Sequence, residues 1–192
     1  MLKKIALTGN IAVGKSELLK IFKKLGSFTI DADEIAHDLL ENDNEIKLKV
    51  IDIFGKEILE KNKISRKKIA KIVFSDENKL KKLEELIHPK LLTTIEKEYE
   101  KVKNKNFEFF VVEVPLLFEK HYQSLFDIVI TIVAKDVIAK KRYKDKDYTL
   151  RKQKQMSAIE TEKLSDFIIE NNQSLSDLEE SIKKISITFK TF

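Results

Sequence analysis

The sequence contains no cysteine, and this absence removes several kinds of chemistry at once. Without thiols the chain has no disulfide framework, no thiolate metal site and no cysteine nucleophile. It has only four glycines and two prolines, and it contains no Pro/Gly-rich linker, low-complexity tract or internal repeat. No apolar run approaches the roughly 18 residues of a membrane-spanning helix, and Met1 to Lys4 lead directly into a predicted strand, which leaves no room for a signal peptide. We therefore expect a soluble, cytoplasmic protein.

Chain length and charge limit the possible domain organisation and the possible binding partners of the protein. A chain of 192 residues can form one α/β domain with a sizeable core and a small inserted subdomain, but not two large domains. The 37 basic and 32 acidic residues give a net charge of +5, so the surface is densely charged but only mildly cationic. This balance slightly favours an anionic nucleotide as partner and does not demand nucleic acid. We expect no nucleic-acid or membrane partner, and a monomer or small homo-oligomer.

The most specific pattern is Gly9 to Ser16, which reads G-x-x-x-x-G-K-S directly after a short apolar run. The pattern is typical of a phosphate-binding loop, in which a strand ends and main-chain N–H groups converge on a polyphosphate at a helix N-terminus. Lys15 would reach the β- and γ-phosphates, and Ser16 would ligate Mg²⁺. We predict a strand over 4–8 and a helix over 17–25. The alternative is a glycine turn that joins strand to helix without binding phosphate.

Two carboxylates follow the second predicted strand, 27–30. Asp31 and Asp33 come at its carboxyl end, where open α/β sheets place their chemistry. Asp33 can act there as a general base towards a hydroxyl beside the γ-phosphate. Alternatively, Asp31 or Asp33 is the N-cap of a helix predicted over 34–40, because aspartate is a favoured N-cap residue. Spacing alone leaves both roles open.

Residues 34–104 change from strand patterning to helical periodicity, which predicts an insertion made of helices. Among these helices, one begins behind Ser65 as N-cap, one ends before His88-Pro89, and the next runs from Pro89 to Val102. An insertion of this size usually builds a substrate pocket or lid.

Two side chains of this insertion are candidates for a binding role. Arg66 is the only arginine in the first 141 residues. A guanidinium at the start of a helix can make a bidentate contact with an anion, and a surface salt bridge is the alternative. For His88, a helix-end residue that bonds a carbonyl is favoured over a metal ligand, because no zinc-type spacing of His, Asp or Glu surrounds it.

Further strands complete the predicted sheet. The first of them is nearly continuous in apolar residues, which suits a central parallel strand covered on both faces. Glu113 lies near its carboxyl end, where it can hold the Mg²⁺ shell or a water; the alternative is a peripheral glutamate that faces solvent or pairs with lysine. After the last strand, a capping-box pattern at Ser176 and Glu179 predicts a closing helix over 177–185. The strands are predicted over 107–114, 127–133 and 166–171.

A polar segment separates the last two predicted strands. We predict helices over 134–142 and 149–156, joined by a run of alternating charge. Such runs are normally solvated faces. In a phosphoryl-transfer enzyme, however, cations on a mobile segment can close over the transferring group, which makes Arg142 and Lys146 lid candidates.

Taken in order, these segments resemble the dephospho-coenzyme A kinase family along almost the whole chain. The D-A-D-x-I-A box at 31–36 and the P-L-L-F-E box at 115–119 separate this family from other small phosphate-loop kinases. The joint order and spacing of the segments carry the resemblance. The matching segments are Leu7 to Ser16, Ile30 to Ala36, Ser65-Arg66, Ile72 to Asp76, Leu83 to Pro89, Val114 to Glu119, Gln155-Met156 and Ser165 to Asn171.

The resemblance implies transfer of the ATP γ-phosphoryl group to the ribose 3′-hydroxyl of 3′-dephospho-CoA, giving CoA and ADP, with Mg²⁺ as cofactor. It favours Asp33 as the base over Asp33 as a cap, with Lys15 and Arg142 also in catalysis. The implied lid residues are Arg142 and Lys146, and the implied metal-binding residues are Ser16 and Glu113. The implied substrate-binding residues are Asp33, Arg66, His88 and Pro89. The implied ATP-binding residues are Gly9, Asn10, Ile11, Ala12, Val13, Gly14, Lys15, Ser16, Glu17 and Asn171.

Four positions depart from the family pattern. Ala12 replaces a glycine that is common in the loop, and Glu17 replaces the usual threonine. Ala139 stands where the lid often has glutamine, and Lys146 stands where a second arginine is common. Lysine cannot reproduce the bidentate contact of a guanidinium, so these departures bear most on the lid.

We therefore predict an α/β, P-loop NTPase-type three-layer fold with a central parallel sheet of about five strands. The core would comprise 1–33, 105–135 and 164–192, with a helical substrate-binding insertion over 34–104 and a short lid over 136–163. The nearest alternative is a nucleoside or nucleotide monophosphate kinase with a different acceptor. A GTP-dependent switch is disfavoured because the sequence has no Asn-Lys-x-Asp box, and a nucleic-acid-binding protein because it has no aromatic-rich basic patch.

Overall fold

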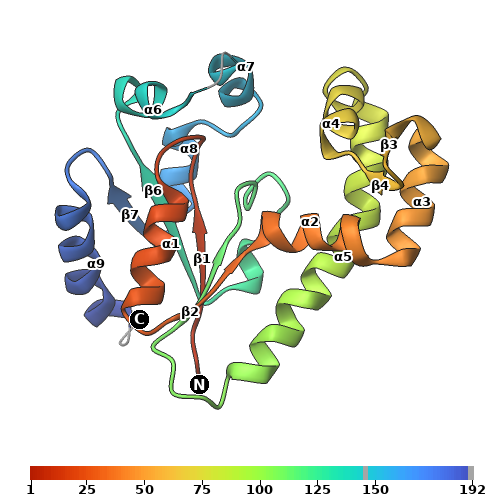
Figure 1. Cartoon of the computed structure of the whole chain (residues 1–192). Coiled ribbons are helices and arrows are strands. Elements are labelled where there is room, and N and C mark those ends of the chain that lie inside the picture. Colours follow the sequence, from red (N-terminus) through yellow and green to blue (C-terminus); the bar gives the residue numbers. More distant parts are fainter. Residues whose placement is uncertain (145–146, 190–192) are drawn as a thin grey trace. The chain divides into compact units, whose positions relative to one another are not determined.

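The computed structural model describes residues 1–144 and 147–189, and the chain divides into two compact units (Figure 1). The first unit comprises Met1–Asp31 and Glu100–Phe192. The second is Ala32–Tyr99, which overlaps the insertion expected over 34–104. No helix in the described part of the chain is both long enough and apolar enough to cross a membrane.

A five-stranded parallel sheet forms the centre of the first unit, in the order β2-β5-β1-β6-β7. The predicted parallel sheet of about five strands is thus confirmed. Because parallel strands end at the same edge, the segments that follow β1, β2, β5 and β6 leave the sheet on one side, where α/β proteins bind ligands. The strands are β1 (Lys4–Thr8), β2 (Phe28–Asp31), β5 (Phe110–Glu113), β6 (Ile128–Val133) and β7 (Phe167–Glu170).

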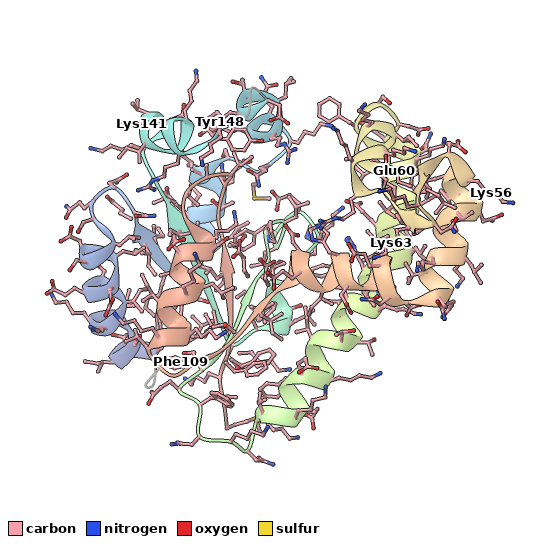
Figure 2. All side chains as sticks on the ribbon, in the orientation of Figure 1. Lys56, Glu60, Lys63, Phe109, Lys141 and Tyr148 are labelled. Carbon is pink, nitrogen blue, oxygen red and sulfur yellow. The ribbon has the colours of Figure 1, made fainter. Side chains whose placement is uncertain are left out.

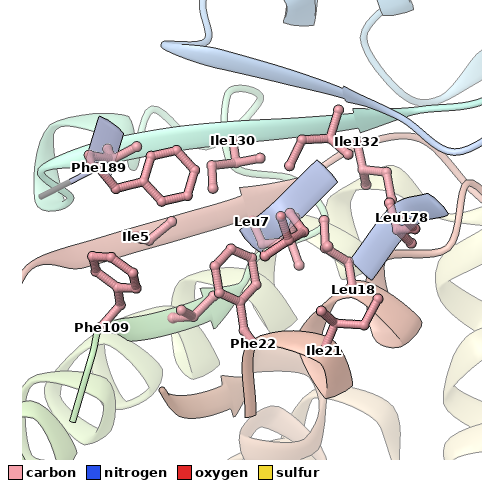
Figure 3. Close-up of a cluster of buried hydrophobic side chains, with 14 of the residues drawn as sticks. Ile5, Leu7, Leu18, Ile21, Phe22, Phe109, Ile130, Ile132, Leu178 and Phe189 are labelled. Carbon is pink, nitrogen blue, oxygen red and sulfur yellow. The ribbon is translucent and has the colours of Figure 1, made fainter. Parts of the chain in front are cut away.

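Both faces of this sheet are buried. Alternate side chains of β1 and β6 pack on one face against α1 (Lys15–Lys24) and α9 (Leu175–Phe189), as Figure 3 shows. The intervening residues, such as Ala6 and Val129, are buried as well. Burial on both sides explains why these strands read as nearly continuous apolar runs. The cluster in Figure 3 includes Ile5, Leu7, Leu18, Phe22, Ile130, Ile132, Leu178 and Phe189.

The described residues of the segment 136–163, which the sequence predicts to be a lid, form three short helices in place of the two expected. Ser157 is the N-cap of the additional helix, α8, through a capping box with Glu160. Its side chain accepts a hydrogen bond from the Glu160 N–H, and the Glu160 carboxylate accepts one from the Ser157 N–H. These helices are α6 (Asp136–Arg142), α7 (Tyr148–Gln153) and α8 (Ala158–Lys163); a 3₁₀ turn, η2 (Gln123–Leu125), precedes β6.

The second unit is mostly helical, with one short hairpin. The labelled side chains Lys56, Glu60 and Lys63 in Figure 2 mark the 3₁₀ turn and the hairpin. The elements of this unit are α2 (Ala32–Asn42), α3 (Asn44–Phe54), η1 (Lys56–Ile58), β3 (Leu59–Glu60), β4 (Lys63–Ile64), α4 (Arg66–Ser75) and α5 (Glu77–Val102), of which α5 continues past the boundary of the unit.

A single helix, α5, replaces two predicted ones, so the break expected at His88-Pro89 is wrong. Pro89 has no N–H to donate to the Glu85 carbonyl, which normally costs helix stability. The helix continues because one of its faces carries an apolar residue at every fourth position, and burial of this face offsets the lost hydrogen bond. These buried residues are Ile87, Leu91, Ile95 and Tyr99.

The start of α9 also differs from the prediction. The helix begins at Leu175, so Ser176 lies inside it and the capping box expected at Ser176 and Glu179 is wrong. Ser174 caps the helix with Asp177: the Ser174 N–H donates to the Asp177 carboxylate at 3.0 Å, and the Asp177 N–H donates to Ser174 Oγ at 3.3 Å. Glu179 instead pairs with lysines.

Candidate functional site

The segment between β1 and α1 has the backbone of a phosphate-binding loop. Gly9 has φ of 142° and Gly14 has φ of 101°. A Cβ atom on Gly9 would lie 2.3 Å from the main-chain oxygen of Ile132 in β6, and a Cβ atom on Gly14 would lie 2.3 Å from Nδ2 of Asn171. Both contacts are too short, so the two glycine positions of the G-x-x-x-x-G-K-S pattern require glycine here for steric reasons.

Ala12 also adopts a left-handed backbone conformation, with φ of 61°. This is one of the positions at which the sequence departs from the family pattern that it resembles. A left-handed conformation brings Cβ close to the following carbonyl and costs an L-residue roughly 1–2 kcal/mol. The loop therefore keeps its shape at Ala12 against a local energetic preference.

Lys15 extends across the loop from the first residue of α1. Its Nζ donates to the carbonyl oxygens of Gly9, at 2.9 Å, and of Asn10, at 3.1 Å. Ser16 and Glu17 follow in the first turn of the helix. The helix N-terminus and the ammonium group together favour an anion at this place.

Asn171 and Arg142 make hydrogen bonds to the main chain of the loop at Val13. Asn171 follows β7, is buried, and donates from Nδ2 to the carbonyl oxygen of Val13 at 2.8 Å. Arg142, at the end of α6, donates from Nη1 to the Asn171 carbonyl at 3.0 Å and to the Val13 carbonyl at 3.4 Å. The structure thus brings the predicted lid arginine and the predicted ATP-binding asparagine together at the loop.

Glu113 is buried at the carboxyl end of β5, with 5% of its surface exposed. It pairs in register with Leu7 of β1 on one side and with Asp31 of β2 on the other. The alternative of a peripheral glutamate facing solvent is therefore wrong. β1 ends at Thr8, directly after Leu7, and the loop follows. The Glu113 carboxylate therefore belongs to the strand that lies beside β1, next to the loop.

Sequence reasoning gave no role to Gln155 and Met156, although they form one of the segments that resemble the family. The structure connects both to distant segments. Oε1 of Gln155 accepts a hydrogen bond from the Ile11 N–H at 2.8 Å, and Oε1 of Glu119 accepts one from the Met156 N–H at 2.8 Å. In the sequence, a role for these two residues is indicated by their place among the segments that resemble the family.

Two tyrosine–aspartate pairs connect α6 with α7. Asp136 accepts from the Tyr148 hydroxyl at 2.7 Å and pairs with Lys152 (Figure 2 labels Tyr148). Burial and the bond to Asp136 raise the pKa of Tyr148 to about 12, while the hydrogen bonds from Lys152 and Tyr148 lower the pKa of Asp136.

The second pair uses Asp147, which accepts from the Tyr143 hydroxyl at 2.7 Å and from Nε of Arg151 at 2.7 Å. Hydrogen bonds from Arg151 and Tyr143 lower the pKa of Asp147. These bonds fix the end of α6, where Arg142 lies, relative to α7. The other lid candidate, Lys146, lies outside the described residues.

The remaining predicted site residues lie in the second unit. Asp33 is exposed in the first turn of α2. Because this helix begins at Ala32, Asp33 is not its N-cap, and the position directly before the helix belongs to Asp31, the other residue of the capping alternative. Arg66 is the first residue of α4 and is exposed, and it has no ion pair with any of residues 1–144 or 147–189. Ser65 occupies the expected N-cap position, but its side chain makes no capping bond. His88 and Pro89 lie inside α5, so His88 is not a helix-end residue.

The described residues suit a magnesium ion held largely by a nucleotide. No group of three or more His, Cys, Asp or Glu side chains in this part of the chain is arranged to hold a metal ion. Magnesium at nucleotide sites usually takes one or two protein oxygens together with phosphate oxygens and waters. The hydroxyl of Ser16 and the carboxylate of Glu113 are donors of this kind.

Comparison with known proteins gives one consistent family. Residues 3–177 match the sequence pattern of dephospho-CoA kinases. The dephospho-CoA kinase of Protochlamydia amoebophila (strain UWE25) is 37% identical over 199 residues, covering 100% of this chain and 98% of that protein. That of Aquifex aeolicus (strain VF5) is 36% identical over 190 residues, covering 96% of each. The solved structure of dephospho-CoA kinase from Campylobacter jejuni is 32% identical, covers 98% of this chain and 99% of its own, and superposes with a TM-score of 0.73.

Proposed function

The chain belongs to the dephospho-CoA kinase family, and we propose that it transfers the γ-phosphoryl group of ATP to the ribose 3′-hydroxyl of 3′-dephospho-CoA, giving CoA and ADP. It is then an ATP-dependent phosphotransferase with an alcohol acceptor, and it performs the final step of coenzyme A biosynthesis. The observation that carries this proposal is the glycine-shaped loop between β1 and α1, with the Lys15 ammonium group directed across it.

Phosphoryl transfer needs positioning and charge stabilisation more than covalent chemistry. Loop N–H groups and Lys15 hold the β- and γ-phosphates, and the carbonyls of Gly9 and Asn10 keep the Lys15 ammonium group directed across the loop. Arg142 and Lys146 screen the charge of the transferring group. Support for the part of Arg142 is its hydrogen bonds to Val13 and Asn171 beside the loop.

Ser16 and Glu113 would hold Mg²⁺ as part of this arrangement. When bound, the ion would supply positive charge that stabilises the negative charge developing on the phosphates. Support comes from the place of Ser16 in the first turn of α1 and from the burial of Glu113 at the end of the strand beside β1.

Asp33 accepts or orients the proton of the 3′-hydroxyl, and Arg66, His88 and Pro89 contribute to binding dephospho-CoA. Support for the role of Asp33 is its place two residues after the carboxyl end of β2 and the exposure of the residue to solvent. The free electron pair of a carboxylate within hydrogen-bond reach of the hydroxyl is what a general base requires.

The test of the function is ATP consumption by the purified protein with different acceptors. We expect ADP formation to depend on dephospho-CoA, and the product to carry a new 3′-phosphate. Nucleosides and nucleoside monophosphates should support little turnover. A faster reaction with one of these acceptors than with dephospho-CoA would contradict the proposal and favour a nucleotide kinase.

Asp33→Asn should separate chemistry from nucleotide binding. We expect kcat to fall by at least about 100-fold, the usual contribution of a positioned general base, with the Kd for ATP nearly unchanged. Asp52→Asn is the matched control, since Asp52 is an exposed aspartate of α3 in the same unit, and it should leave kcat as in the wild type. Near-normal turnover by Asp33→Asn would remove Asp33 from the role of base.

A further inference from the structure

The peptide group between Asn10 and Ile11 is held at both of its ends. Its oxygen, on Asn10, accepts from Nζ of Lys15 at 3.1 Å. Its N–H, on Ile11, donates to Oε1 of Gln155 at 2.8 Å. Because a peptide group is planar, the direction of its N–H fixes the direction of its oxygen. Gln155 therefore determines how one of the two carbonyls that hold the Lys15 ammonium group is oriented.

Gln155 reaches the loop from a segment 144 residues away in the sequence. It lies between α7 and α8, and its neighbour Met156 donates its N–H to Oε1 of Glu119 at 2.8 Å. Glu119 follows Leu117 and Phe118, which are almost completely buried, with 0% and 2% of their surface exposed. The main chain beside Gln155 is thus attached to a part of the chain that is fixed in the core.

An N–H group that is partly buried needs an acceptor, and a hydrogen bond at one end of a peptide group polarises the other end. The bond from Ile11 to Gln155 consequently strengthens the Asn10 carbonyl as an acceptor for Lys15. Loss of this bond would free the peptide group to rotate and would leave the Lys15 ammonium group less firmly directed across the loop.

We propose that Gln155 is a positioning residue for the bound triphosphate, and that Glu119 supports it through the Met156 N–H. Gln155 keeps the Asn10–Ile11 peptide group in the orientation that directs Lys15 across the loop, so that the ammonium group is already in place when the phosphates arrive. This inference rests on the proposed function, since it assumes that the loop binds ATP.

The first test measures the Kd for ATP, in the presence of Mg²⁺, for Gln155→Ala and Gln155→Asn. The asparagine variant keeps the amide but is one methylene too short to reach Ile11. We expect both variants to bind ATP roughly 3- to 10-fold more weakly, the range for a lost hydrogen bond. The KM for dephospho-CoA should remain as in the wild type, and the unfolding temperature without nucleotide should fall by no more than the loss of one hydrogen bond requires. Gln153→Ala, an exposed glutamine at the end of α7, is the matched control and should bind ATP normally.

Unchanged or tighter ATP binding by both Gln155 variants would overturn the proposal. Tighter binding would mean that Gln155 competes with a phosphate oxygen for the Ile11 N–H. A uniform loss of stability and of affinity for both substrates would also overturn it, because it would indicate a general structural role.

The second test addresses Glu119. Glu119→Gln keeps an oxygen that can accept from the Met156 N–H and should bind ATP like the wild type, whereas Glu119→Ala should bind it more weakly. In the double variant with Gln155→Ala, the loss at Glu119 should add nothing further, because Glu119 acts through Gln155. Fully additive losses would contradict this connection.

The two proposals can fail separately. ATP binding is measured without any acceptor, so a wild-type protein that binds ATP but does not phosphorylate dephospho-CoA would refute the proposed function and leave the role of Gln155 open to the same test. A wild-type protein that phosphorylates dephospho-CoA, with Gln155 variants that bind ATP equally well, would refute the role of Gln155 alone.

Discussion

Ala12 carries a side chain in a backbone conformation that glycine adopts without cost. Its φ of 61° places Cβ near the following carbonyl, and the residues around it hold this geometry nevertheless. Strain of this kind concentrates at binding loops, where the surrounding structure fixes the backbone. The backbone conformation of Ala12 therefore lowers the stability of the folded chain.

Ala12→Gly should stabilise the protein. The strain at φ of 61° disappears in glycine, and after allowance for the greater freedom of glycine in the unfolded chain we expect the free energy of unfolding to rise by about 1 kcal/mol. Urea titration measures the change. Ala70→Gly, at an exposed position inside α4, is the control of opposite sign and should lower the free energy by about 1 kcal/mol. A loss of stability in Ala12→Gly would contradict the assignment of strain.

Single residues differ in how far the sequence predicts their role. Gly9, Gly14, Lys15 and Ser16 follow a fixed local pattern, so the loop could be predicted from it. Gln155 reaches its partner across 144 residues. No local pattern specifies such a contact, because it depends on how the segment between α7 and α8 packs against the loop.

At the scale of helices, α1 and α9 are joined by an ion pair as well as by their apolar faces. The Glu179 carboxylate of α9 lies 2.8 Å from Nζ of Lys24 in α1 and 2.7 Å from Nζ of Lys183 one turn further along α9. Hydrogen bonds from Lys183 and Lys24 lower the pKa of Glu179 from 4.5 to about 2. The charged form of Glu179 thus favours the folded state.

This pair predicts how stability depends on pH. A pKa lowered by folding stabilises the protein above the unfolded value of 4.5, and the effect is lost as the pH falls through about 2. Glu179→Gln should therefore be less stable than the wild type near pH 6, and the difference should shrink as the pH falls from 4.5 towards 2. Urea titrations over this pH range measure it.

Glu180→Gln is the matched control for this experiment. Glu180 lies beside Glu179 and pairs with Lys184 on an exposed surface, where ion pairs contribute little. Its stability should follow that of the wild type over the whole range. A difference between Glu179→Gln and the wild type that stays constant with pH would contradict the role of the ion pair.

The boundaries of α5 and α9 could not be predicted from hydrophobic periodicity alone. The period of α5 continues through His88-Pro89, but proline is a strong local signal for a break, so the sequence favours two helices. At the start of α9, Ser174 and Ser176 both satisfy the capping pattern with an acidic residue three positions later. In the structure Ser174 is the cap, and Glu179, the acidic residue that Ser176 would need, pairs with Lys183 and with Lys24 of another helix.

At the scale of the whole molecule, ATP should stabilise the folded chain in proportion to its binding. A ligand that binds only the folded state stabilises it by about 2.7 kcal/mol at 100 times its Kd. We expect the unfolding temperature of the wild type to rise with the concentration of ATP and Mg²⁺, and Lys15→Ala to lose most of this rise. Lys23→Ala, an exposed lysine in the last turn of α1, is the control and should retain it.

A full ATP-dependent rise in the unfolding temperature of Lys15→Ala would contradict the assignment of the loop as the ATP-binding site.

The fold class and the family of the chain could be predicted from the sequence, because short motifs in a fixed order along the whole chain indicate both. The second unit, Ala32–Tyr99, overlaps the expected insertion. Its limits follow from packing between segments, which local composition does not report.

A side chain at position 9 or at position 14 would clash with a neighbouring residue, and only one of the two clashes could be relieved by mutating that neighbour. A side chain at position 14 would meet the amide of Asn171, which a second substitution could make smaller. A side chain at position 9 would meet the backbone oxygen of Ile132, which every amino acid carries. Replacing another side chain cannot remove that obstacle, so a larger residue at position 9 would require the main chain of the loop or of β6 to move.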